Sequence, residues 1–311
     1  MALLSIETKK FDNLYSIISF LKTAPNANDK IEKAIYGLDS NEIKGLEELQ
    51  CIKEVNEFFN IKGLKDIETR ADFIKKVYEV IKSYNNDKLI WKLENPETNE
   101  SFDLANISKS GLGAVSGIQD LIRFITWLHL QDIVPIGVNN KIINQQFKSD
   151  HPLKENGYVM IVFNDFRRSQ ATQWANSLLL SNEIGTVSDI MPNFDFALDI
   201  YLKKENFRKG STIKVSEFMD NLSKEYPWIM QGKIGKTAIQ DVIETQSLPW
   251  WKNDYDSKYI IQPSVSKSLL IAQEEKKIEL IPPKDDDNSK NYILSVTNEP
   301  CLNLKVLNPN G

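Results

Sequence analysis

Apolar residues recur every three to four positions through most of this chain, which is the spacing of helices with one buried face. In the segment 11–22, for example, Leu14, Ile17, Ile18 and Leu21 fall on one side of the expected helix. The same spacing predicts helices over 28–38, 43–59, 71–84, 115–130, 169–180 and 194–204. We therefore expect a mainly helical protein.

The clearest pattern lies in the last third of the chain. Short helices are predicted over 215–225 and 236–245, on either side of a break at 226–228, and residues 259–261 have the composition of a strand. A further helix begins at Pro263 and Ser264, and Ser264 is its expected N-cap.

That last helix leads into two apolar segments, 278–281 and 292–296, which a polar tip at 282–290 separates. A helix followed by two strands and a charged connection is the arrangement of a winged helix. The sequence therefore predicts a winged-helix module from about Ser211 to Thr297.

A similar order of elements occurs near the N-terminus, where predicted helices precede a partly alternating segment at 88–93 and a turn-rich segment at 95–99. An ordinary helical bundle with an added hairpin fits that pattern as well. The most strand-like run of the chain, 158–163, lies in the central section.

We therefore expect an α+β, mainly helical protein, built from tandem winged-helix-like units with short β-hairpins. The expected divisions are an N-terminal helical or winged-helix-like domain (1–108), a central α+β region (109–208) and a C-terminal winged-helix-like domain (209–311).

Composition adds limits on location and partners. The chain is 41% hydrophobic and 26% charged, which is typical of soluble globular proteins. It offers no signal-peptide core and no membrane span, so we expect a cytoplasmic protein. Cys51 and Cys301 lie far apart and have no histidine beside them, which argues against a zinc site or a disulfide framework. The formal net charge of -5 means that any DNA contact must come from a local basic patch or from another subunit.

Side chains suited to catalysis are scarce. His129 and His151, the two histidines, show no metal-ligand spacing, and we interpret His129 as a partly buried structural residue and His151 as a solvated one. The glycine-rich segments 111–117 and 232–237 lack the full pattern of a phosphate-binding loop. Glu275 and Asp286 are the candidates for a metal-dependent nuclease, although solvated charge explains both. The expectation is no catalytic residue, no metal and no cofactor.

Basic residues gather around Gly210, and two more lie where a turn meets a helix further along the chain. If the helix that begins at 263 entered a major groove, its exposed contacts would be Ser264, Ser266, Lys267 and Gln273. Glu274, Glu275 and the aspartates at 285–287 oppose that use, and a solvated linker explains the basic cluster equally well. The candidate nucleic-acid-binding residues are Lys203, Lys204, Arg208, Lys209, Lys214, Lys233, Lys236, Ser266 and Lys267.

Two further features suit a binding partner. Trp250 and Trp251 could form an exposed aromatic anchor for a partner protein, or they could seal the junction between the helices and the wing. Arg167 and Arg168 follow the strand-like run and could clamp a phosphate or a carboxylate, although a surface pair is the simpler interpretation.

The residues from Ser264 to Leu280 and from Tyr292 to Leu294 resemble the last helix and wing of the DpdG-like proteins, which are encoded in bacterial DNA-modification and defence gene clusters. The first six residues and the segment 123–136 are similar to that family as well. The resemblance implies an accessory defence component that carries a winged helix and has no known catalytic residues to transfer.

Taken together, the residues favour a non-enzymatic architectural or recognition subunit of a bacterial defence or DNA-processing complex. Its expected partners are other protein subunits, with double-stranded DNA as an auxiliary contact and no membrane. The first alternative is a winged-helix DNA-binding regulator, and the second is a metal-dependent nuclease.

Overall fold

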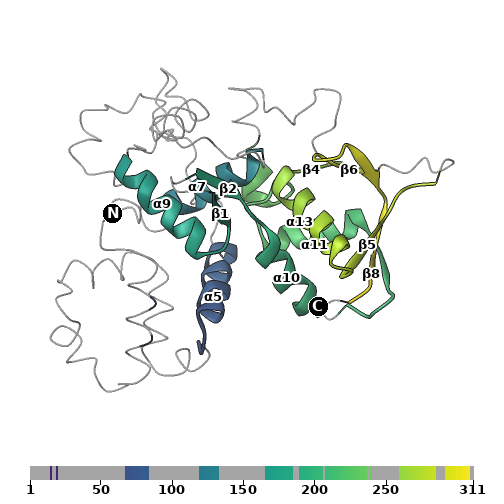
Figure 1. Ribbon diagram of the computed structural model, residues 1–311, viewed down its shortest axis with the longest axis horizontal. Helices are drawn as coiled ribbons and strands as arrows, with labels where there is room; N and C mark the ends of the chain where they lie inside the picture. The colour runs from purple at the N-terminus through teal and green to yellow at the C-terminus, as the bar shows by residue number, and fades with distance from the viewer. Residues whose placement is uncertain are drawn as a thin grey trace, which may run out of the picture. The chain divides into compact units, whose positions relative to one another are not determined.

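The protein is α+β in its computed structural model (Figure 1). The structure describes residues 67–83, 119–132, 165–184, 189–205, 207–236, 259–284 and 291–308, together with Tyr15, Ser19 and Ile239. Among these residues, no helix is both long and apolar enough to cross a membrane. The chain divides into two units, Met1–Phe124 with Pro152–Leu178, and Ile125–His151 with Leu179–Gly311. The expected domain limits at 108 and 208 stay a prediction.

In the first unit, the described elements are α5 (Arg70–Ser83) and α9 (Asp165–Ser177), with the start of α7 (Gln119–Leu130). Helix α5 buries Phe73, Ile74, Val77, Tyr78 and Ile81, as the predicted apolar face requires. The Tyr78 hydroxyl donates a hydrogen bond of 2.5 Å to the carbonyl of Leu178, just after α9. This bond satisfies a buried phenol and joins α5 to the end of α9.

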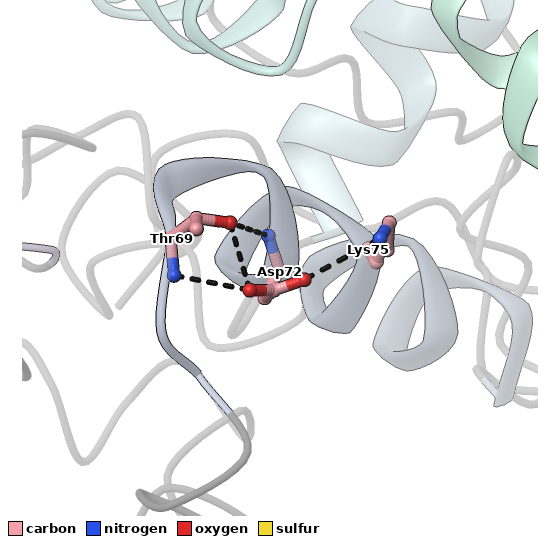
Figure 2. A network of polar contacts seen from close by, with 3 residues as sticks. All are labelled: Thr69, Asp72 and Lys75. Carbon is pink, nitrogen blue, oxygen red and sulfur yellow. Dashed lines mark hydrogen bonds and ion pairs between the residues drawn. The ribbon is translucent and has the colours of Figure 1, made fainter.

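A reciprocal cap begins α5 (Figure 2). The Thr69 hydroxyl accepts the Asp72 backbone N–H at 3.2 Å, and the Asp72 carboxylate accepts the Thr69 backbone N–H at 3.0 Å. Lys75 donates to the same carboxylate at 3.3 Å. The hydrogen bonds from Thr69, ahead of the charge of Lys75, lower the pKa of Asp72. Two backbone donors that a helix start leaves unpaired are thus satisfied within one turn.

The second unit contains the remaining elements. In chain order they are β1 (Ser181–Ile184), β2 (Asp189–Pro192), α10 (Asp195–Lys204), β3 (Thr212–Lys214), α11 (Val215–Glu225), β4 (Ile260–Ile261), α13 (Pro263–Glu274), β5 (Ile278–Ile281), β6 (Tyr292–Leu294), β7 (Glu299–Cys301) and β8 (Asn303–Val306). Strands β1 and β2 form an antiparallel pair, and two three-stranded sheets have the orders β3-β8-β5 and β4-β6-β7.

The core of this unit lies between the helices and the sheet β3-β8-β5, where α11 contacts β3 and β8 and α13 contacts α10 and β5 (Figure 1). Aromatic rings fill it edge to face: the centroids of Tyr201 and Phe218 are 5.3 Å apart, and Tyr226 lies 5.2 Å from both Phe194 and Trp228. Burial raises the pKa of Tyr201 and Tyr226 well above the ordinary range of a phenol.

The predicted hairpin between 278–281 and 292–296 is wrong. Strand β5 pairs with β8 in antiparallel register, with Ile278 opposite Val306 and Leu280 opposite Leu304, whereas β6 pairs with β4 and β7. In β8, buried and half-buried positions alternate, so Leu304 and Val306 extend the apolar face that Ile278 begins. Residues 292–301 instead form a hairpin of their own inside the connection from β5 to β8.

Several predicted helices are confirmed. The structure has α5, α10 and α11 within one residue of the predicted 71–84, 194–204 and 215–225, and α9 begins four residues earlier than predicted. Residues 233–236 and Ile239 are helical, so the helix predicted over 236–245 begins earlier than predicted. The predicted helices 28–38 and 43–59, the segments 88–93 and 95–99, and the strand-like run 158–163 lie outside the described residues.

Candidate functional site

Helix α13 is the centre of the candidate site, and its first two turns are buried on nearly every side. Pro263 occupies the first turn, where its missing N–H costs nothing, and Gln262 is the N-cap residue. The expectation that Ser264 caps the helix is wrong. The Gln262 side chain donates to the carbonyl of His129 at 3.0 Å and accepts the backbone N–H of Met230. The start of α13 is thereby tied to two distant segments of the chain.

His129 lies against this helix start. Its ring is fully buried, its Nδ1 lies 3.0 Å from the Ser264 hydroxyl, and Phe194 packs edge-on at 5.8 Å. Burial lowers the pKa of His129 to about 3, so the imidazole is neutral near pH 7. The interpretation of His129 as a structural residue agrees with this geometry, and its burial is complete rather than partial. A ring without solvent access cannot serve as an acid or base for a bound substrate.

The serines of α13 are internal as well. The Ser266 hydroxyl donates to the carbonyl of Ile261 at 2.7 Å and accepts the backbone N–H of Ser295 at 3.2 Å. Ser268 donates to the carboxylate of Asp195 and to the carbonyl of Ser264. The prediction that Ser264 and Ser266 are exposed is wrong. His129 and Gln262 supply polar partners for the buried Ser264 hydroxyl, and the Ile261 carbonyl and the Ser295 N–H supply those of Ser266.

The far end of α13 is exposed and acidic. Lys267 is half-buried and directs its ammonium to the sulfur of Met191 at 3.7 Å. Gln273 is exposed as predicted, and its side-chain carbonyl accepts the backbone N–H of Leu280 at 2.8 Å. Glu274 and Glu275 are both exposed. The exposed end of the helix therefore presents two carboxylates where a DNA-reading helix would meet phosphates, and one of them, Glu275, pairs with Lys277 at 2.6 Å.

A groove opens beside this exposed end. Its volume is about 360 Å³, and it lies between α13, the end of β5 and the β6–β7 hairpin. The lining is mostly apolar and consists of Leu270, Gln273, Leu280, Pro282, Leu294, Glu299, Pro300 and Cys301. Burial raises the pKa of the Cys301 thiol to about 11, so the thiol is protonated and contributes to the groove as a small apolar group.

The basic candidates lie on other elements. Lys203 and Lys204 end α10, Arg208 and Lys209 precede β3, and Lys214 ends β3; all five are exposed. The Lys204 ammonium lies 2.8 Å from the Glu225 carboxylate, which neutralises part of the cluster.

Lys305 on β8 belongs with this cluster and was missed from the sequence. In the register, Thr212 lies opposite Lys305 and Lys214 opposite Asn303, so Lys214 and Lys305 point to the same face of the sheet. The alternation of Asn303-Leu304-Lys305-Val306 was the signal that could have revealed the strand.

Lys233 and Lys236 are exposed in the first turn of a helix that begins at residue 233, and Lys236 belongs to the Gly-Lys-Thr sequence at 235–237. The backbone N–H groups of Ile234 and Gly235 donate to the carbonyl of Pro227 at 2.9 and 3.0 Å, so they are unavailable to a phosphate. A Cβ on Gly232 or Gly235 would collide with backbone atoms of the 227–230 turn. These glycines therefore allow two backbone segments to pack closely. This structural role agrees with the interpretation that residues 232–237 resemble a phosphate-binding loop only by chance.

The other candidates lie wholly or partly outside the described residues. Trp250, Trp251, His151 and Asp286 lie outside the described residues, and Arg167 and Arg168 are placed only as backbone within α9. Among the residues that the structure does describe, no cluster of His, Cys, Asp and Glu could hold a metal ion.

Comparison with protein families matches the chain to a family model. The family model described as DpdG-like matches residues 95–287, which is more than half of the chain. No curated protein and no solved structure matches the chain. The matched region includes α13 and β5 and ends before β6.

Proposed function

The chain belongs to the DpdG-like family, and on that premise we propose that it is a non-enzymatic recognition or architectural subunit of a cytoplasmic bacterial DNA-modification or defence complex. It acts through protein–protein contacts made by a winged-helix unit, with DNA as an auxiliary contact. The observation that carries this proposal is the burial of the first half of α13 and the acidic charge of its exposed end.

The order of elements supports the winged helix. Helix α10, strand β3 and helix α11 come first along the chain, helical residues at 233–236 and strand β4 follow, and helix α13 and strands β5 and β8 come last. The sheet order β3-β8-β5 is antiparallel throughout. In this assignment α13 takes the place of the third helix, and strands β6 and β7 belong to an enlarged wing between β5 and β8. The polar tip predicted over 282–290 is thus only the first part of that connection.

The character of α13 favours a protein partner over a DNA groove. Recognition helices contact base edges with their N-terminal residues, and here those residues bond to His129, Asp195 and Ser295. The exposed residues beyond them are Gln273, Glu274, Glu275 and Lys276, and Glu275 pairs with Lys277 at 2.6 Å. Inserting this end into a major groove would bring carboxylates toward phosphates, which repel them.

A purification of the tagged full-length chain from its native host tests the proposal, with the co-purifying proteins identified by mass spectrometry. We expect a defined set of protein partners, and only weak binding of free duplex DNA by the purified chain. Recovery of the chain alone, as a monomer, would contradict the subunit role.

The role of Trp250 and Trp251 can be separated in the same experiment. If they form an aromatic anchor, replacing both with Ala lowers partner recovery at an unchanged melting temperature. If they seal the junction between helices and wing, the same change lowers the melting temperature first.

The basic cluster supports a second candidate function, a DNA-binding regulator. Arg208→Glu with Lys209→Glu changes the charge of this cluster, and Lys75→Glu with Lys76→Glu makes the same net change on α5 as a control. Binding of a duplex is measured by fluorescence anisotropy at several salt concentrations. Tight binding that weakens steeply with salt, and that only the first pair of changes reduces, would favour the regulator.

A further inference from the structure

Apolar side chains dominate the lining of the groove beside α13. Leu270, Leu280 and Leu294 come from three different elements, and Pro282 and Pro300 lie at its edges. A volume of about 360 Å³ falls at the lower end of the roughly 300–1,000 Å³ that is common for binding pockets. The groove therefore suits a few large side chains rather than a bulky cofactor.

Its charge is acidic. Glu299 is the charged residue of the lining, and Glu274 lies one helical turn beyond Leu270 on the same side of α13. Neither carboxylate takes part in an ion pair among the described residues. Lys284 lies two residues after the lining residue Pro282, so among these described residues two carboxylates and one ammonium carry the charge near the groove. A ligand with positive charge next to an apolar group complements this surface.

Backbone pairing at the groove is restricted. Strand β7 is the outer strand of its sheet, but Pro300 at its centre has no N–H to donate. An added strand would therefore find an incomplete ladder. Recognition falls instead to side chains that enter the groove, and to the Gln273 amide, whose Nε2 can donate to a ligand carbonyl while its Oε1 accepts from Leu280.

We propose that this groove binds a short segment of a partner protein in which large aliphatic side chains stand next to lysine or arginine. The aliphatic side chains occupy the space between Leu270, Leu280 and Leu294, and the cationic group lies by Glu299 and Glu274. This inference rests on the proposed function, because it assigns the partner contact of the subunit to a particular surface.

Fluorescein-labelled synthetic peptides provide the direct test with the full chain. One peptide has two leucines followed by two lysines, a second has two leucines followed by two glutamates, and a third has two serines followed by two lysines. Fluorescence anisotropy should show saturable binding of the first peptide and at least tenfold weaker binding of the other two. Equal binding of the first and third peptides would overturn the proposal, since charge alone would then account for it.

Two variants locate the binding. Leu270→Glu should weaken binding of the leucine–lysine peptide at least tenfold. Glu299 is exposed, so Glu299→Lys should leave the fold unchanged. It should reverse the preference, so that the leucine–glutamate peptide binds more tightly than the leucine–lysine peptide. Glu279 is the neighbour of Leu280 in β5, and its side chain lies on the opposite face of the strand from Leu280. Glu279→Lys therefore makes the same charge change away from the groove and should alter peptide binding by less than twofold. Equal losses in Glu299→Lys and Glu279→Lys would refute the site.

Sedimentation of the unliganded chain tests whether a second copy of the chain occupies the groove instead. A concentration-dependent dimer that Leu270→Glu abolishes would assign the groove to a second copy of the chain and overturn the peptide proposal. Purification from the native host then separates the two proposals. If the wild-type chain recovers partners and Glu299→Lys recovers the same partners in equal amounts, the groove proposal fails while the subunit role stands. If the wild-type chain comes alone although it binds the peptide, the subunit role fails.

Discussion

Acidification should destabilise the second unit through one residue, His129. Its buried ring is neutral in the folded protein because burial lowers its pKa to about 3, whereas an exposed histidine titrates near 6.5. Below pH 6.5 His129 therefore binds a proton in the unfolded chain but not in the folded chain. Stability from this group is fully present above pH 6.5 and falls as the pH drops toward 3, by about 1.4 kcal/mol for each pH unit. At pH 5 the expected loss is about 2 kcal/mol.

Urea unfolding, followed by tryptophan fluorescence between pH 7.5 and pH 5, measures this loss. His129→Asn keeps an amide near the Ser264 hydroxyl but cannot titrate, so its stability should be lower at pH 7 and should change less on acidification. His151→Gln removes the other histidine and serves as the control that keeps the wild-type slope. Parallel curves for the wild-type chain and His129→Asn would refute the reasoning, because the pH dependence would then come from other groups.

Three further changes have defined consequences for stability, each measured as a melting temperature and by urea unfolding. Thr69→Ala removes one side of the cap on α5 and should cost about 1 kcal/mol, with loss of helix signal confined to the first unit. Gly235→Ala should cost several times as much as Gly210→Ala, because the first Cβ meets backbone atoms, while the second has open space and only a positive φ of 84° to oppose it. Equal effects at the two glycines would contradict that explanation. Ser266→Ala removes the hydrogen bonds of its hydroxyl to the carbonyl of Ile261 and the N–H of Ser295. Those two backbone groups still bond to each other at 3.2 Å, so the expected cost is about 1 kcal/mol. Lys267→Ala on the same helix should change stability by less than about 0.5 kcal/mol, as is usual for surface changes.

Local signals in the sequence were sufficient for the helices. The apolar spacing in α5, α10 and α11 set their limits to within one residue, since each helix must bury one face wherever it packs. The rejection of residues 232–237 as a phosphate-binding loop also needed no structure, because the required glycine and the preceding strand are missing from the sequence itself.

The pairing of strands could not be predicted from local patterns in the sequence. The segment 292–294 is as apolar as a wing strand should be, and nothing local indicates that its hydrogen bonds go to β4 and β7. The true partner of β5 is β8, about 25 residues away in the sequence, where only a four-residue alternation marks a strand. Pairing depends on which face becomes buried in three dimensions, and that is decided by the helices that cover the sheet.

The candidate site shows the same division between sequence and structure. By itself, the sequence determined that α13 exists, that its last turn is acidic and that charge would disfavour a phosphate backbone there, because these properties depend on residue type and helical spacing alone. Only the tertiary structure decided that Ser264 and Ser266 are internal and that Leu270, Leu280 and Leu294 enclose a groove. A hydroxyl can lie in a core or on a surface with equal ease, and the outcome depends on whether distant segments supply its hydrogen-bond partners.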